Sequence, residues 1–130
     1  MKTGMKIIPA EYVFEARLLK AKQAKDLPGN ILDVFGNSYW LEDPVEYTTV
    51  KAKDVVPDFN GTSRVLNLGT IVTTYLGVRP TLWCSSSYVE KLNLKLYEEV
   101  KIFGRDWIYI GLNGFLCSGL IGKSAFNRYL

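Results

Sequence analysis

The last third of the chain consists of short β-forming runs separated by turn signals, and this pattern restricts the fold more than any other feature. Residues 100–103 and 107–110 are rich in β-branched and aromatic side chains, and they flank Gly104-Arg105-Asp106. Asn113-Gly114, a favoured dipeptide of two-residue hairpins, then leads into residues 115–117. The sequence therefore predicts three strands in meander order in this region.

The preceding residues predict further strands and one helix. Apolar residues recur every three positions from Leu18 to Leu27, with lysines between them, and Pro28-Gly29-Asn30 ends this expected amphipathic helix. A strong turn signal at residues 57–61 predicts a hairpin. The other expected strands, chosen for their β-branched and aromatic content, cover residues 12–18, 39–41, 45–56 and 64–66. Residues 70–75 and 78–84 are expected to form two further strands or one long bent strand.

These elements predict an α+β fold that is mostly antiparallel β, with one or two short helices. A length of 130 residues matches one ordinary domain, so we expect a single domain over residues 1–130. Gly77 is expected to let the backbone bend, and Pro80 to lie at an edge or bulge. Ser124 is expected to cap a short terminal helix, and Ser85-Ser86-Ser87 to form a loop.

The chain contains no histidine, which excludes the most versatile acid–base group and every catalytic triad built on it. Carboxylate chemistry could still use Glu42, Asp43 or Asp54, and the serine run beside Cys84 resembles a nucleophile cluster. The glycine spacing near Lys123 does not form a phosphate-binding loop. We therefore expect a protein that is not an enzyme, without a cofactor or a metal.

Two cysteines, Cys84 and Cys117, are expected to be reduced and buried, with a disulfide between them as the alternative. Charged residues and Pro9 interrupt any apolar segment near the start, so no signal peptide is predicted. The apolar runs are also too short to span a bilayer. These features predict a cytoplasmic protein that does not use a membrane as its partner.

The net charge of +3 is unevenly distributed, because basic residues prevail at both ends and acidic residues prevail between positions 31 and 60. A candidate basic patch consists of Lys20, Lys22, Lys25 and Arg105. Lysines at this spacing are also typical of the solvated face of a short helix. Charge alone therefore leaves both a nucleic-acid contact and an ordinary surface open.

Two segments resemble a family signature. Tyr39-Trp40-Leu41-Glu42-Asp43-Pro44 and Gly77-Val78-Arg79-Pro80-Thr81-Leu82-Trp83 resemble the W-L-R-S-P and G-V-R-P-A-L-W signatures of a family of bacterial and prophage domains of unknown function. The resemblance covers about residues 12–84. In the first signature, Glu42 and Asp43 replace Arg and Ser. Residues 103–110 are similar to the segment that opens the family's domains, but here they follow the closing signature. Either the order of segments is permuted, or the chain covers the boundary of a tandem repeat. The late Arg-Pro strand is also similar to C-type-lectin-like folds, an analogy of fold only.

Some residues of these segments are assigned structural roles and others are candidate partner contacts. Arg79 is expected to pair with a carboxylate or to cap backbone carbonyls, because an unpaired buried charge is costly. Trp40 and Trp107 are expected in the core. The candidate partner contacts, which are aromatic residues and a turn residue suited to an interface, are Tyr39, Phe59, Asn60 and Trp83.

The function expected from these observations is a non-catalytic protein-interaction module of a small bacterial or prophage protein. The alternative is a phage-type inhibitor of a host defence nuclease, or a direct nucleic-acid binder that uses the basic ends. Self-association through exposed strand edges is a further expectation. The sequence does not identify the partner protein.

Overall fold

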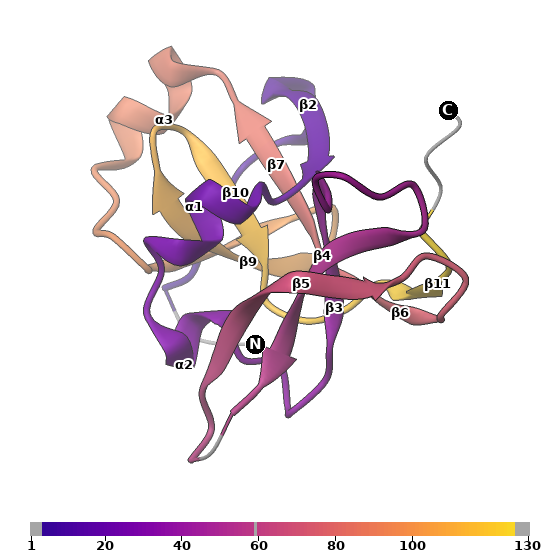
Figure 1. Cartoon of the computed structure of the whole chain (residues 1–130). Helices are drawn as coiled ribbons and strands as arrows, with labels where there is room; N and C mark the ends of the chain where they lie inside the picture. Colours follow the sequence, from indigo (N-terminus) through magenta and orange to yellow (C-terminus); the bar gives the residue numbers. More distant parts are fainter. Residues whose placement is uncertain (1–3, 59, 127–130) are drawn as a thin grey trace. The chain divides into compact units, whose positions relative to one another are not determined.

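The computed structural model describes residues 4–58 and 60–126 and divides into two compact units (Figure 1). The first unit comprises Met1–Arg17 and Pro80–Gly119, and the second comprises Leu18–Arg79 and Leu120–Leu130. Each unit contains one sheet in which most strand pairs are antiparallel, and the helices are short. The predicted α+β class dominated by β structure is therefore confirmed.

The sheet of the first unit has six strands in the order β1-β8-β9-β10-β7-β2. Only the pairing of β1 with β8 is parallel among the strand registers that are defined in this sheet. Strands β8, β9 and β10 form the predicted meander, with register pairs such as Val100 with Trp107 and Phe115 with Tyr109. The strand bounds are β1 Lys6–Ile7, β2 Val13–Leu18, β7 Pro80–Cys84, β8 Glu99–Ile102, β9 Arg105–Gly111 and β10 Gly114–Cys117.

An apolar core holds this unit together. Its members alternate along the strands, as expected where one face of each strand is buried. The buried cluster consists of Ile8, Leu82, Cys84, Val89, Val100, Ile102, Trp107, Phe115 and Cys117. Helix α3 (Ser86–Leu92) contributes Val89 and ends at Asn93, which adopts the left-handed conformation. The two cysteines are both buried thiols, as the sequence predicted.

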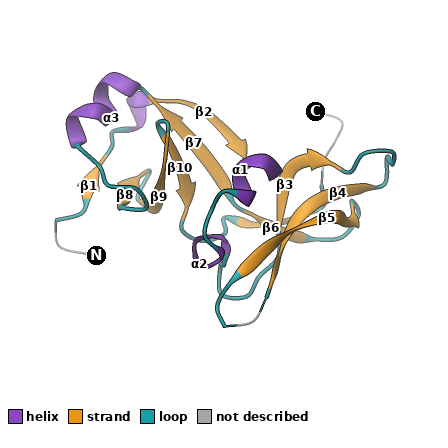
Figure 2. Ribbon diagram, turned by 60° about the vertical axis from the view of Figure 1, so that its left-hand side comes forward, coloured by secondary structure: helices purple, strands orange, loops and turns teal. Residues whose placement is uncertain are grey.

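The sheet of the second unit has five strands in the order β11-β6-β3-β4-β5, and Figure 2 labels β3, β4, β5 and β6 of this sheet. The pairing of β3 with β6 is parallel, and the other defined pairings are antiparallel. Strands β4 and β5 form the hairpin predicted from the turn at residues 57–61. The strand bounds are β3 Tyr39–Pro44, β4 Lys51–Pro57, β5 Ser63–Ile71, β6 Leu76–Val78 and β11 Gly122–Ser124.

Two short helices replace the single helix expected over residues 18–27. Helix α1 (Ala21–Lys25) buries Ala21 and Ala24, and helix α2 (Gly29–Leu32) buries Leu32. Leu18 instead ends β2, so the three-residue spacing overestimated the length of α1. Pro28 precedes α2 with extended backbone angles, so the Pro-Gly-Asn segment begins a helix as well as ending one.

Three other local expectations were wrong. Residues 45–50 form a turn, although their β-branched content predicted a strand, and the serine run begins α3 instead of a loop. Residues 72–75 also form a turn, although residues 70–75 were expected to be a strand. Ser124 belongs to β11 and pairs with Leu76, and most of the terminal helix expected after it falls on residues 127–130, which lie outside the described part of the chain. Gly77 is required for close packing: an added Cβ would lie 2.5 Å from Leu120 Cδ1 and 3.0 Å from the Ser38 carbonyl oxygen.

Candidate interaction surface

Exposed apolar side chains gather at one end of the second unit's sheet. Tyr47 and Val50 lie in the turn between β3 and β4, while Ile71 ends β5 and Tyr75 follows it. The two turns are adjacent, because Lys51 pairs with Ile71 and the Val72 N–H donates to the Val50 carbonyl at 2.9 Å. Tyr75 is 72% exposed and Tyr47 is fully exposed.

A bulge in β5 adds a fifth apolar residue. Between the pairs Ala52–Thr70 and Asp54–Leu66, β5 contains two more residues than β4. The bulge turns Leu68 outward, where it is 76% exposed. We call Tyr47, Val50, Leu68, Ile71 and Tyr75 the apolar rim.

Gly69 allows the bulge to form. Its φ is +70°, a conformation that L side chains rarely adopt. An added Cβ would also lie 2.4 Å from Val45 Cγ2 and 2.5 Å from the Ala52 carbonyl oxygen. The position of Leu68 therefore depends on the absence of a side chain at the next residue.

A buried carboxyl group lies on β4, the strand that pairs with the bulged β5. Asp54 is 1% exposed, and the Thr70 hydroxyl donates to its Oδ2 at 2.9 Å. Its Oδ1 has no hydrogen-bond partner among the described residues. Burial raises the pKa of Asp54 to about 6, and the Thr70 hydrogen bond opposes this shift. Asp54 is therefore an electrostatically costly group next to the rim.

The other carboxylates considered for chemistry do not form a reactive group with Asp54. Asp43 Oδ1 accepts the Ala21 N–H at 2.8 Å, which caps the first turn of α1. The Glu42 N–H donates to the Leu19 carbonyl at 2.9 Å, and so both residues of the altered first signature help to hold the segment before α1. Within residues 4–58 and 60–126, no cluster of three or more acidic or cysteine side chains could hold a metal ion.

The predicted partner contacts differ in burial and belong to both units. Tyr39 is fully buried, so it was wrong as a surface contact; its hydroxyl donates to the Leu32 carbonyl, and burial raises its pKa. Trp83 is half-buried in the first unit, where its ring lies against Gly114. Asn60 is exposed at the tip of the β4–β5 turn in the second unit, and Phe59 lies outside the described residues.

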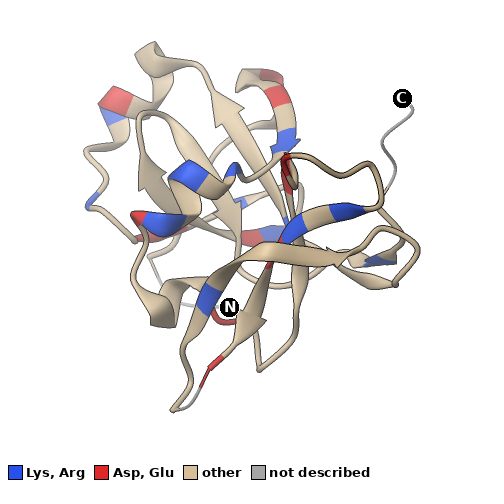
Figure 3. Ribbon diagram, in the orientation of Figure 1, with Lys and Arg blue, Asp and Glu red and all other residues tan. Residues whose placement is uncertain are grey.

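The candidate basic patch also divides between the units. Lys20, Lys22 and Lys25 are exposed on and beside α1, and Figure 3 shows basic residues on the ribbon in this region. Arg105 is exposed at the start of β9 in the first unit. The three lysines therefore form one short basic cluster. Arg105 belongs to the other unit.

Arg79, Trp40 and Trp107 are all buried. Arg79 Nη1 donates to the carbonyls of Ile31 and Leu32 at 2.9 and 3.1 Å, and to the Tyr39 hydroxyl at 2.9 Å. The sequence predicted either a carboxylate or backbone carbonyls as partners of the Arg79 guanidinium, and these hydrogen bonds are to backbone carbonyls. The Trp40 and Trp107 indole N–H groups donate to the carbonyls of Ser124 and Ile102, respectively.

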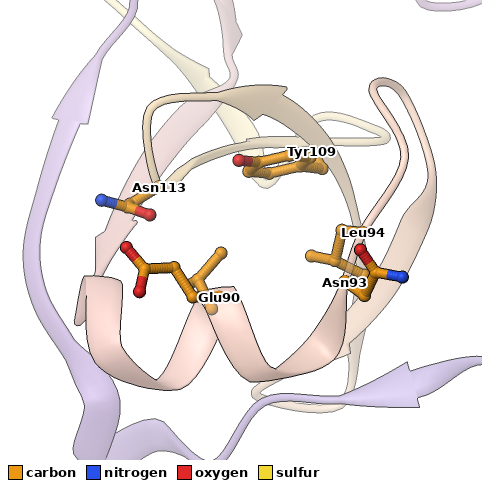
Figure 4. Close-up of a pocket in the computed structure, with 6 residues that line it drawn as sticks. Glu90, Asn93, Leu94, Tyr109 and Asn113 are labelled. Atoms are coloured by element: carbon orange, nitrogen blue, oxygen red, sulfur yellow. The ribbon is translucent and has the colours of Figure 1, made fainter.

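A small open pocket lies between α3 and the β9–β10 hairpin of the first unit (Figure 4). Its volume is about 210 Å³, below the range of pockets that enclose drug-sized ligands. Tyr109 covers one side, and its ring also packs against Phe115 with centroids 5.2 Å apart. The polar side chains of Glu90, Asn93 and Asn113 line the opening. The pocket is therefore a shallow surface hollow.

No family model, curated protein or solved structure was found to match the chain. No helix among residues 4–58 and 60–126 is both long and apolar enough to cross a membrane. The family resemblance consequently rests on its two sequence segments. The structure places the first segment on β3, and the second runs from β6 to β7 across the junction of the two units.

Sequence reasoning missed every residue of the apolar rim. Residues 45–56 and 70–75 were expected to be strands, so their apolar side chains were assigned to sheet faces. Neither turn contains glycine, and no proline lies within residues 45–50 or 72–75. Leu68 and Gly69 lay between the expected strands 64–66 and 70–75. The one available signal was Gly69, because an isolated glycine in a β-forming region often marks a bulge.

Proposed function

We propose that the chain is a non-catalytic protein-interaction module that binds another protein through the apolar rim. The observation that carries this proposal is the exposure of five large apolar side chains on two adjacent turns and a bulge. Exposed apolar groups that gather in this way mark interaction surfaces more often than isolated ones do. Tyrosine is also enriched at interfaces, because it offers a large contact area together with a polar hydroxyl.

The surroundings of the rim favour a protein partner over a strongly charged partner such as nucleic acid. Lys53, the basic residue opposite the bulge, is paired with Glu46 at 3.3 Å, and its side chain is 12% exposed. Lys51, which is exposed and pairs in register with Ile71, adds one basic side chain beside the rim, so the rim combines apolar side chains with few charged ones. This composition resembles the centre of a protein interface, where charged residues are depleted.

The proposal includes the setting inferred from the sequence. The two signature-like segments support membership of the bacterial and prophage family of unknown function, and a cytoplasmic location accompanies it. Capture experiments are therefore designed for bacterial lysate.

The test compares tagged wild-type protein with a rim variant that carries Tyr47→Ser and Tyr75→Ser. A matched control carries Phe35→Ser and Leu112→Ser, which remove two exposed apolar side chains outside the rim. Captured material from lysate with and without nuclease treatment is analysed by gel and mass spectrometry. We expect a specific protein that the control retains and the rim variant loses at least about tenfold, since interface aromatics often dominate binding.

Equal capture by all three proteins would overturn the role of the rim. Capture that nuclease abolishes would instead support the second candidate, a nucleic-acid-linked role such as inhibition of a defence nuclease. The observation that favours this candidate is the exposed cluster of Lys20, Lys22 and Lys25. Changing the three lysines to glutamate should then abolish nucleic-acid binding. The affinity of the wild-type protein for nucleic acid should fall steeply as the salt concentration rises.

A further inference from the structure

Strand β2 forms one edge of the six-stranded sheet. It is the last strand in the order, next to β7, and no other described strand pairs with its outer side. Residues 14–17 are all exposed, and Phe14 is 72% exposed. A strand at the edge of a sheet can serve as a template for pairing with a strand of another chain.

The side chains of β2 are complementary to a second copy of the same strand. In an antiparallel pair about a two-fold axis through Ala16, Glu15 lies opposite Arg17 of the second copy, and Arg17 lies opposite its Glu15. Phe14 lies opposite Leu18 of the second copy in the same register. The pairing therefore places two opposite-charge pairs on one face and two apolar pairs on the other.

The structure supports this division of faces. Arg17 Nη1 and Glu15 Oε1 lie 3.8 Å apart within one chain, as expected for alternate residues whose side chains share a face. Their side chains remain 41% and 46% exposed, so both can also reach a strand laid beside them.

We propose that β2 pairs with β2 of a second copy and joins the two six-stranded sheets into one continuous sheet. Charge complementarity selects this occupant, because an edge with one sign of charge would repel its own copy. A pair of short strands buries less surface than the interface of a stable dimer. We therefore expect a weak dimer, whose fraction changes with protein concentration over the range that sedimentation can measure. Residues 13–17 of β2 belong to the first unit and Leu18 to the second, and the proposal uses no residue of the apolar rim.

The test uses charge reversal on both sides of the pair and sedimentation velocity over a concentration series. Glu15→Arg places arginines opposite one another, and Arg17→Glu does the same with glutamates. Each variant alone should weaken self-association by about tenfold or more, since like charges directly opposite are unfavourable. An equimolar mixture should restore association as a heterodimer, because every opposing pair is then of opposite sign.

Asp26→Arg and Lys91→Glu serve as matched controls, since they change the net charge equally at exposed positions outside β2. Both controls should associate like wild type, and circular dichroism checks that every variant is folded. A wild-type protein that stays monomeric at all concentrations would overturn the proposal. Single variants that associate like wild type, or a mixture that fails to restore association, would do so as well.

Discussion

At the scale of single residues, the second unit depends on a buried guanidinium. Arg79 satisfies two carbonyls at the end of α2 and the hydroxyl of a fully buried tyrosine. Helix α2 has four residues, so it cannot be stable by itself and needs such external partners for its terminal carbonyls. A charged residue in an apolar strand context is therefore an anchor for the helix that precedes it in the sequence.

Replacing Arg79 with alanine should destabilise the protein by about 3 kcal/mol or more, because buried acceptors lose their donors and a cavity forms. Arg79→Lys should recover part of this loss, since an ammonium can reach fewer acceptors than the fork of arginine. Urea unfolding followed by tryptophan fluorescence measures both changes. Arg64→Ala, which removes an exposed arginine paired with Asp58, should cost no more than about 0.5 kcal/mol. Similar losses for the two alanine variants would contradict the anchoring role.

Asp54 makes a different residue-scale prediction, in which stability falls as pH rises. Its folded pKa, about 6, lies above the ordinary value of 3.8, so the folded state binds the proton more tightly than the unfolded state. The contribution from Asp54 is complete below pH 4 and is lost as pH rises towards 6. The linked change is of the order of 3 kcal/mol at most.

Asp54→Asn should remove this contribution to the pH dependence, because asparagine keeps an oxygen for the Thr70 hydroxyl and does not ionise. The measurement is the free energy of unfolding in urea at several pH values between 4 and 7. Asp58→Asn, at an exposed carboxylate, provides the control. An unchanged slope in Asp54→Asn would show that other groups cause the pH dependence.

At the scale of elements, the bulge in β5 determines where the rim lies. Gly69→Ala should destabilise the hairpin by about 2 kcal/mol or more, because a positive φ and two close contacts oppose the added Cβ. Gly61→Ala is a matched control, since Gly61 has a similar φ of +72° but no atom within 4 Å of an added Cβ. Thermal unfolding should show a clearly larger loss for the alanine at position 69. Equal losses would mean that backbone strain alone matters and that packing against Ala52 does not.

Strands with explicit turn signals were predicted well from the sequence, and turns without them were not. The turn at 57–61 placed one hairpin, because Asn60 and Gly61 both adopt positive φ, which these residue types tolerate. A second hairpin forms near the predicted Asn113-Gly114, but its turn residues are Leu112 and Asn113, and Gly114 already begins β10. Residues 45–50 and 72–75 turn with threonine, valine and tyrosine, whose preference for strands is overridden by tertiary contacts such as the hydrogen bond between Val72 and Val50. The candidate surface lies on these turns, which is why the sequence did not reveal it.

The buried residues of the signature segments illustrate a second limit. Arg79 was expected to bind carbonyls or a carboxylate, because the cost of a buried charge can be inferred from its apolar neighbours. Tyr39 was misplaced on the surface, since an amphipathic side chain suits both an interface and a core in which its hydroxyl is bonded. The signature segment indicates that Tyr39 matters, but its side chain points inward because its hydroxyl donates to the Leu32 carbonyl in α2, a helix that the sequence did not predict.

At the scale of the whole molecule, the chain builds its units from segments that are distant in sequence. The second unit includes residues from 120 onward, which return after the first unit's meander is complete. There β11 pairs with β6, the Trp40 indole donates to the Ser124 carbonyl at 2.8 Å, and Phe126 packs edge-on to Trp40 at 5.4 Å. The C-terminal residues therefore complete a sheet that begins much earlier in the sequence.

A chain that ends after Gly119 should consequently lose structure in one unit and keep it in the other. Hydrogen exchange of backbone amides should accelerate at least about tenfold in β3 and β6, while β8, β9 and β10 retain most of their protection. A chain that ends after Phe126 keeps the contacts of β11 and is the control. Equal loss of protection in both sheets would show that the units unfold together, as the single domain predicted from the length requires. Selective loss would show two units whose stabilities are separable, because the meander and its apolar core do not need the returning segment.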